Sequence, residues 1–190
     1  VFVHLYSGRR RVGDFDWFIY DLAARVGLSV YCLSVDLVVD RKRNVLVARV
    51  FSQLRLWCWS GFVDFLLDES PCGSWSAVRH QGGGPPPLRT RSEPYGRSGL
   101  APRYARALQR GSELYLRGID LLEWCLACCA GGVKEHPTDR GRHPFASSWN
   151  TPQWRRLRDV YGVREISFPQ CLYGASHRKM STLGGDAEGL

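Results

Sequence analysis

Short apolar runs alternate with amphipathic stretches from the first residue of the chain. Residues 1–6 and 28–35 have the composition of strands, whereas residues 14–26 between them carry apolar positions at helical spacing. Asp14 can cap this helix and Gly27 can end it. The amino-terminal part therefore predicts a strand, a helix and a second strand.

The segment 45–59 fits two patterns. Its first three residues suit a strand, whereas Val50, Leu54 and Trp57 recur at helical spacing, so both interpretations stay open. A short apolar run over 62–67 then has the length and composition of a buried strand.

Residues 80–101 are rich in Gly, Pro and Arg and predict a long loop. A loop of this length in a compact domain is usually functional or disordered. Pro102 can open a long helix, which the two glycines at 131–132 end, and residues 133–137 predict a short strand that stops at proline.

A last helix is expected to begin at Thr151-Pro152 and to end at Gly162, before a strand over 163–168. Strands thus alternate with helices nearly throughout. We therefore expect one α/β domain over 1–183, followed by a disordered tail over 184–190. The expected fold is Rossmann-like, with a mostly parallel, doubly wound sheet that carries helices on both faces.

The composition is that of a globular protein, with 44% hydrophobic residues and a formal net charge of +8. An excess of arginine favours a polyanionic partner, although ordinary solubility charge explains it equally well. The arginines between 89 and 110 likewise suit a nucleic-acid face or a solvated surface. No apolar stretch is long enough to cross a bilayer, so we expect no membrane partner.

Seven cysteines lie mostly in apolar runs, which favours free thiols and an intracellular, reducing compartment. Cys125, Cys128 and Cys129 suggest zinc at first sight. However, Cys125 and Cys129 are one turn apart on an apolar helix face, so we expect core packing and no metal. The chain begins with valine and its one methionine is Met180, so we expect a fragment of a longer protein.

Candidate chemistry gathers where the predicted strands end, which is where open α/β sheets bind ligands. Cys72 is a possible nucleophile or a small buried hydrophobe, and Glu135 a possible proton donor or a strand-end acid paired with arginine. Gly8 would let backbone approach a cofactor and Asp36 would accept from ribose hydroxyls. The alternatives are a plain turn and a solvated acid.

Five features of the chain resemble motifs of the cytosine-C5 DNA methyltransferases. The segment 71–76 (PCGSWS) is similar to their Pro-Cys motif, 133–137 (VKEHP) to their Glu-Asn-Val motif, and 170–179 (QCLYGASHRK) to their later Tyr-Gly…Arg motif. Residues 5–8 stand where the family has its first S-adenosylmethionine motif, and Asp36 stands at its ribose-binding acid. The order and rough spacing agree over nearly the whole chain.

The sequence departs from the family in several places. Ser70 replaces a common proline, Asp68 and Glu69 put two acids before the thiol, and His136-Pro137 replaces Asn-Val. No target-recognition region or closing cofactor motif follows, so the expected methyltransferase domain is incomplete at its carboxyl end.

The resemblance implies roles for individual residues. Cys72 would add to C6 of a flipped-out cytosine, Glu135 would contact its ring N3 and amino group, and Arg178 would also contact the base. S-adenosyl-L-methionine would lie against Leu5, Ser7, Gly8, Asp36 and Pro71. The nucleic acid, with DNA expected, would contact Ser76, Arg79, His80, Arg89, Arg91 and Lys179.

The implied activity is methyl transfer from S-adenosylmethionine to C5 of cytosine in DNA. The alternatives are a non-catalytic, basic nucleic-acid-binding module and a decayed mobile-element fragment that keeps the fold. An enzyme acting on eukaryotic DNA would be nuclear.

Overall fold

A computed structural model describes residues 1–9, 11–173, 176 and 179–186. The described residues form one six-stranded sheet in the order β2-β1-β3-β4-β6-β5. Its strands are β1 (Phe2–Leu5), β2 (Cys32–Val35), β3 (Phe65–Asp68), β4 (Gly131–Pro137), β5 (Arg164–Pro169) and β6 (Met180–Gly185). Strands β1 to β4 are parallel, whereas β6 runs antiparallel to both β4 and β5.

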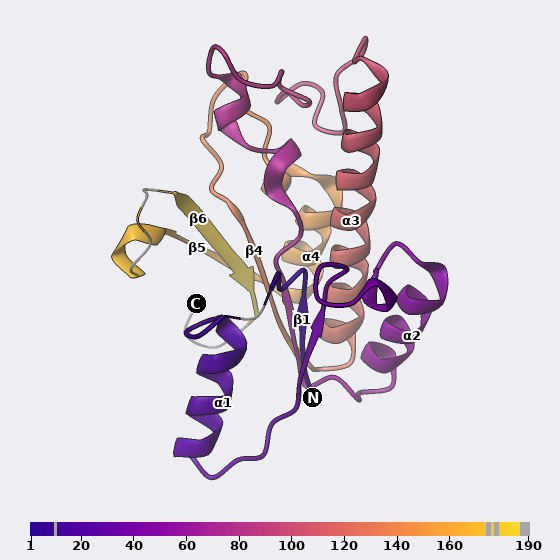
Figure 1. The fold of residues 1–190 in the computed structure, drawn as a ribbon, viewed down its shortest axis with the longest axis vertical. Coiled ribbons are helices and arrows are strands. Elements are labelled where there is room, and N and C mark those ends of the chain that lie inside the picture. The colour runs from indigo at the N-terminus through magenta and orange to yellow at the C-terminus, as the bar shows by residue number, and fades with distance from the viewer. Residues whose placement is uncertain (10, 174–175, 177–178, 187–190) are drawn as a thin grey trace.

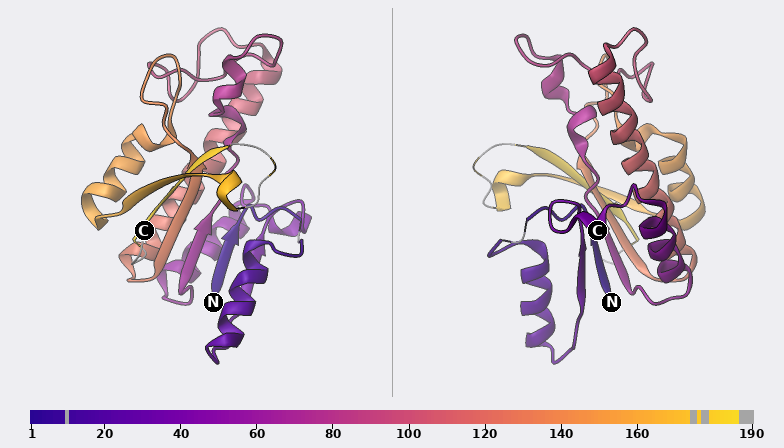
Figure 2. Two further views of the ribbon diagram at one scale, coloured as in Figure 1. Left: turned by 90° about the vertical axis from the view of Figure 1, so that its left-hand side faces the viewer. Right: turned by 45° about the vertical axis from the view of Figure 1, so that its right-hand side comes forward.

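The helices lie on both faces of this sheet (Figures 1 and 2). Helix α1 (Phe15–Arg25) covers one face, and α2 (Ala48–Trp59), α3 (Pro102–Ala127) and α4 (Pro152–Tyr161) cover the other. Strand residues alternate accordingly: Val3 and Leu66 face the larger core under α2, α3 and α4, whereas Phe2 and Leu67 face α1. The structure confirms the predicted Rossmann-like α/β fold.

Local signals account for most helix ends. The Asp14 carboxylate accepts a hydrogen bond from the Trp17 amide at 2.9 Å, and the Thr151 hydroxyl caps α4 in the same way. Gly162 follows α4 in the left-handed conformation, which glycine adopts without strain. The ambiguous segment 45–59 is helical over α2.

The prediction of a disordered tail from residue 184 is wrong for its first residues. Gly184 and Gly185 belong to β6 and pair with β4. A Cβ on Gly184 would lie 2.4 Å from the Trp154 ring, so the strand packs closely only because it ends in glycine. Residues 187–190, the rest of that tail, lie outside the described residues.

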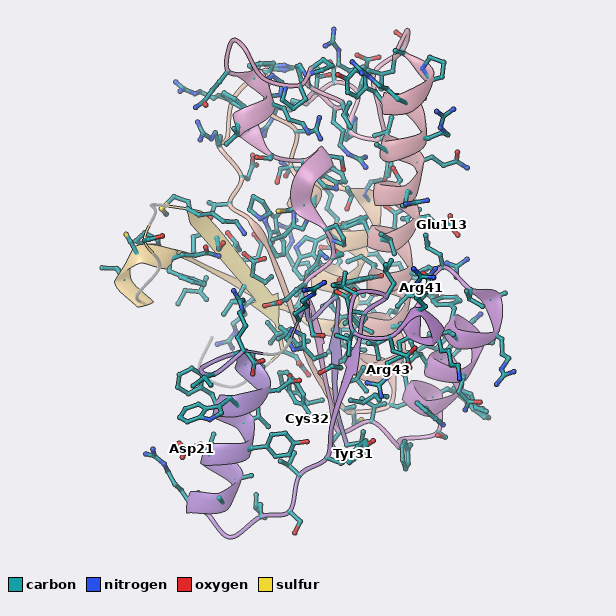
Figure 3. All side chains as sticks on the ribbon, in the orientation of Figure 1. Asp21, Tyr31, Cys32, Arg41, Arg43 and Glu113 are labelled. Carbon is teal, nitrogen blue, oxygen red and sulfur yellow. The ribbon has the colours of Figure 1, made fainter. Side chains whose placement is uncertain are left out.

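The apolar stripe of α1 is mostly not buried. Phe18 is 56% exposed and Leu22 57%, while Ile19 packs against the sheet. Figure 3 shows Asp21 on the same helix, with Tyr31 and Cys32 at the start of β2. No helix in the described part of the chain is both long and apolar enough to cross a membrane.

A buried ion pair joins the two central strands that carry the site. The Lys134 ammonium of β4 lies 2.7 Å from the Asp68 carboxylate of β3, and both side chains are fully buried. Ser70 accepts a second hydrogen bond from Lys134, and the Tyr115 ring of α3 lies 4.8 Å from the ammonium. A Cβ on Gly118 would lie 2.5 Å from Asp68, so α3 needs glycine at this point.

Breaking this pair should destabilise the fold strongly. In Lys134→Met, Asp68 is left buried without a cation, and we expect a loss of about 3 to 5 kcal/mol in the free energy of unfolding by urea. Asp68→Asn added to Lys134→Met should recover part of that loss. Arg25→Met, which breaks an exposed pair with Asp21, should cost under about 1 kcal/mol. Equal losses in Lys134→Met and Arg25→Met would contradict the conclusion that the buried ion pair stabilises the fold.

Candidate active site

The parallel strands deliver four loops to one edge of the sheet. The ends of β1, β2, β3 and β4 lead into Ser7-Gly8, Asp36, the segment 69–76 and Thr138, respectively. Strand β1 lies between β2 and β3, so the chain order reverses beside it. This is the position at which open α/β sheets form ligand crevices.

Asp36 is held by backbone amides. One carboxylate oxygen accepts from the Gly8 amide at 3.0 Å, and the other accepts from the Val38 amide at 2.8 Å. The Gly8 backbone is left-handed, with φ of 67°. These contacts bring the ends of β1 and β2 together and leave Asp36 facing a cavity.

That cavity has a volume of about 190 Å³ and brings Asp36 and Pro71 together. Arg43, Asn44 and Leu114 also line it. The structure does not bring the other predicted cofactor residues there: Leu5 is fully buried in the core, and Ser7 and Gly8 are not among the described lining residues. The volume is below the roughly 300 to 1,000 Å³ of typical ligand pockets.

Tyr6 is a residue of this cavity that sequence analysis missed. Its hydroxyl donates to the Leu114 carbonyl of α3 at 2.8 Å, and burial raises the pKa of the phenol. Its backbone is left-handed, with φ of 62°, which is uncommon for a residue other than glycine. Strained backbone of this kind often accompanies functional sites. Nothing in the sequence indicates the strain at Tyr6, which only the backbone of the structure shows.

Cys72 lines a second, larger pocket of about 580 Å³. The thiol is half-buried and free, so it is not sealed in the core. Ser76 and Lys179, both predicted nucleic-acid contacts, line the same pocket. The pocket lies between the loop after β3, the end of β4 and the segment 145–148.

The two acids that precede Cys72 are engaged elsewhere. Asp68 pairs with Lys134 inside the fold, and a Glu69 carboxylate oxygen lies 3.0 Å from Nε2 of His4. His4 also contacts Asp16 at 2.7 Å. Burial lowers the pKa of His4, but the two carboxylates outweigh it and the net pKa is raised.

Glu135 stands beside the Cys72 pocket but not in its described lining. Alternation along β4 puts it on the opposite face of the strand from His136. Its carboxylate accepts from the Lys179 ammonium at 3.3 Å, and Lys179 itself lines the pocket. Lys179 therefore connects Glu135 to the pocket. One alternative from the sequence was a strand-end acid paired with arginine; in the structure the partner of Glu135 is a lysine.

Trp75 and His136 line the Cys72 pocket, but their side chains are almost fully buried. Among the described residues, Nε1 of Trp75 and Nε2 of His136 are buried polar atoms without a hydrogen-bond partner. The other ring nitrogen of His136 lies 2.7 Å from the Ser148 hydroxyl. Sequence analysis treated His136 only as a departure from the family.

Arg89 was predicted to contact nucleic acid, and its placement contradicts this. The side chain is 1% exposed, lies over the Trp75 ring at 3.9 Å and donates to Ser74, Pro94 and Ser112. Burial lowers the pKa of its guanidinium to about 10. Arg89 instead fastens the long loop to α3.

The other predicted nucleic-acid contacts, Arg79, His80 and Arg91, are not among the described lining residues of the Cys72 pocket. Arg91 forms an ion pair with Asp139 at 3.2 Å, and the His80 ring packs edge-on against Phe145. Arg79 donates to the carbonyls of Gly73 and Pro86. Arg178, the predicted cytosine contact, lies outside the described residues.

Cys125 packs in the core. It is fully buried beside Cys58, and that contact together with burial raises the pKa of its thiol. Among the described residues, no group of three or more His, Cys, Asp or Glu side chains is arranged to hold a metal ion.

Comparisons with known proteins assign no family to the chain. No protein-family model matches the sequence, and no curated protein matches it. Among solved structures, the chain is similar to an E. coli prophage protein provisionally described as a DNA modification methyltransferase, with 14% sequence identity and a TM-score of 0.48. The match covers 97% of this chain and 45% of that protein, so the chain spans less than half of its length.

The buried histidine predicts a pH effect on stability. Burial, followed by the charges of Lys134, Lys179 and Arg89, lowers the pKa of His136 well below 6.5 in the folded chain. The unfolded chain therefore binds a proton that the folded chain excludes, and stability falls as the pH drops below the unfolded value. Relative to His136→Asn, the free energy of unfolding should decline by about 1.4 kcal/mol per pH unit below about 6.5.

Urea unfolding of both proteins between pH 5 and 8 measures this difference. His4 is retained in both, so its opposite titration cancels. Parallel stability curves for the two proteins would show that His136 is protonated in the folded state.

Proposed function

We propose that the chain is a methyl-transfer domain that acts on C5 of cytosine in DNA, with Cys72 as its nucleophile. The observation that carries the proposal is the Cys72 pocket, in which a half-buried thiol and the Lys179 side chain line the same space. It lies beside the cavity of Asp36, so a base and a methyl donor would meet at one edge of the sheet.

The residues that line the Asp36 cavity suit the chemistry of S-adenosylmethionine, whereas the volume of the cavity is below that of typical ligand pockets. Asp36 has lone pairs for ribose hydroxyls, Asn44 offers an amide to the adenine, and Pro71 gives an apolar wall. When bound, this cofactor supplies the methyl group.

The residues of the Cys72 pocket would act on the base. The thiolate forms a bond to C6 of cytosine, and the electron pair of the C5–C6 bond moves toward C5 and the ring. Lys179 brings positive charge to the pocket, next to the electron density that the ring gains. After C5 is methylated, its proton leaves to a base and the C–S bond breaks.

Covalent trapping tests the nucleophile. DNA that contains 5-fluorocytosine lacks the C5 proton, so the adduct cannot resolve and should survive denaturing electrophoresis when the methyl donor is present. We expect Cys72→Ala to abolish the adduct. Cys171→Ala, which removes an exposed thiol, should leave it intact. An adduct that persists in Cys72→Ala would overturn this role.

Calorimetric titration with S-adenosylmethionine tests the cofactor site separately. We expect the native chain to bind and Asp36→Asn to bind at least about tenfold more weakly, because hydrogen bonds to a charged group contribute about 1.5 to 3 kcal/mol. Asp159→Asn changes an exposed acid of α4 that does not line the cavity and is the matched control. An absence of heat with the native chain, together with DNA binding insensitive to Cys72→Ala, would favour the non-catalytic binding module.

A further inference from the structure

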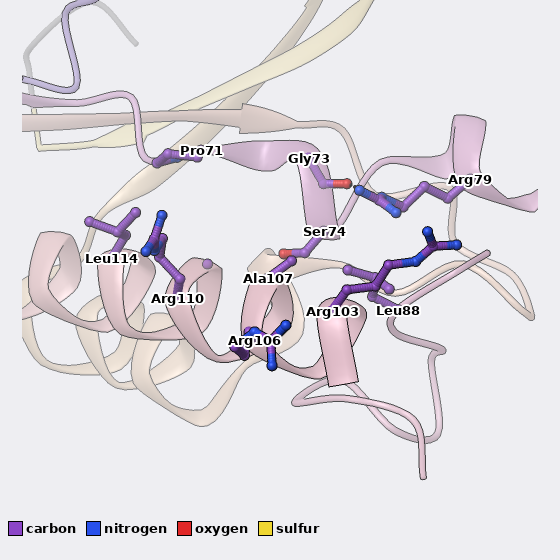
Figure 4. A pocket seen from close by; sticks show the side chains of 11 residues that line it. Pro71, Gly73, Ser74, Arg79, Leu88, Arg103, Arg106, Ala107, Arg110 and Leu114 are labelled. Carbon is purple, nitrogen blue, oxygen red and sulfur yellow. Dashed lines mark hydrogen bonds between the residues drawn. The ribbon is translucent and has the colours of Figure 1, made fainter. Parts of the chain in front are cut away.

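A cavity between the loop after β3 and helix α3 is lined by four arginines. They are Arg79 from the loop and Arg103, Arg106 and Arg110 from the helix (Figure 4). The cavity has a volume of about 540 Å³, and none of its described lining residues is acidic. Sequence analysis left open whether the arginines of this region form a nucleic-acid face or a solvated surface.

No ion pair in the described part of the chain neutralises the four charges. Within the described part of the chain, none of the four arginines takes part in an ion pair, although most other ion pairs of the chain use arginine. Like charges that line one cavity repel one another, and the cavity focuses their field. An anion that enters would relieve this repulsion.

Internal contacts hold the two walls of the cavity together. Buried Arg89 donates to Ser74 of the loop and to Ser112 of α3, which fastens the two walls together. A Cβ on Gly111 would lie 3.1 Å from the Ser74 hydroxyl, so glycine permits this close approach. Arg79 is tethered by the carbonyls of Gly73 and Pro86. Figure 4 shows Arg79 reaching the cavity from the loop and Arg110 pointing toward Pro71.

The spacing on the helix suits a row of phosphates. Arg103, Arg106 and Arg110 lie three and four residues apart, so they share one face of α3. At about 1.5 Å per residue, the row spans about 10 Å. Phosphates along one strand of duplex DNA advance about 3.4 Å each along the axis, so the row is about as long as three phosphate steps and each of the three arginines can face a different phosphate.

We propose that this arginine cavity binds the phosphodiester backbone of the DNA strand. The inference deepens the proposed function, because it gives the proposed DNA substrate a binding surface formed by α3 and the adjoining loop. The Cys72 pocket and the arginine cavity flank the same short segment, Pro71–Trp75, on which the thiol is carried. A backbone held in the cavity would therefore lie next to the segment that presents Cys72.

Fluorescence anisotropy with a labelled 20-base-pair duplex, without methyl donor, tests the proposal. The pocket variant carries Arg103→Gln, Arg106→Gln and Arg110→Gln, all at exposed positions. We expect at least tenfold weaker binding at 0.15 M salt. The slope of log affinity against log salt should shrink by about 2 to 3, because each lost phosphate contact removes about 0.9.

The matched control removes the same charge from other exposed positions, with Arg49→Gln, Arg155→Gln and Arg164→Gln. We expect its affinity to stay near that of the native chain, because charges beyond about 8 Å are screened at this salt concentration. Arg103→Lys, Arg106→Lys and Arg110→Lys should keep the salt slope, which separates lost charge from a damaged fold. Equal affinity of the pocket variant and the control would overturn the proposal.

Titration with tripolyphosphate tests whether the cavity binds a DNA strand or a small phosphate compound. If the three arginines are needed to bind tripolyphosphate but not the duplex, the assignment of the cavity to DNA is wrong. These measurements use no methyl donor and no cytosine chemistry. If trapping at Cys72 fails, a positive result in the duplex-binding experiment still stands. If the duplex-binding experiment fails, the role of Cys72 is still decided by trapping.

Discussion

The buried ion pair between Asp68 and Lys134 is the constraint on which the candidate site depends. It joins the carboxyl end of β3 to the middle of β4, so it holds the loop that carries Cys72 beside the end of β4, where His136 lies. Buried charges are tolerated only when they are paired and hydrogen-bonded, and Ser70 and Tyr115 complete this environment. It also keeps one acidic neighbour of the thiol directed into the fold.

Arg89 has a similar structural role at the long loop of residues 80–101. A guanidinium buried under the long loop is stabilised by the Trp75 ring and by three oxygen acceptors, without a carboxylate among the contacts described. The loop of residues 80–101 is thereby attached to α3. As a result, the Cys72 pocket and the arginine cavity have walls that are held by internal contacts.

The two ligand spaces differ in chemistry, and the difference agrees with the functions proposed for them. The Cys72 pocket contains a thiol and two aromatic residues, which suit a planar heterocycle. The arginine cavity contains four arginines that form no ion pair with the described residues, which suits phosphate. Between them, Pro71 also reaches the smaller cavity of Asp36.

The sequence by itself determined the order and type of most elements, because caps such as Asp14 and Thr151 and apolar periodicity act within a few residues. It also put Cys72 just past a strand end. Only the tertiary structure decided that Arg89 is buried, that Glu135 reaches the pocket through Lys179, and that Gly184 lies within a strand. These outcomes depend on partners distant in sequence, and burial and strand pairing are properties that no local pattern encodes.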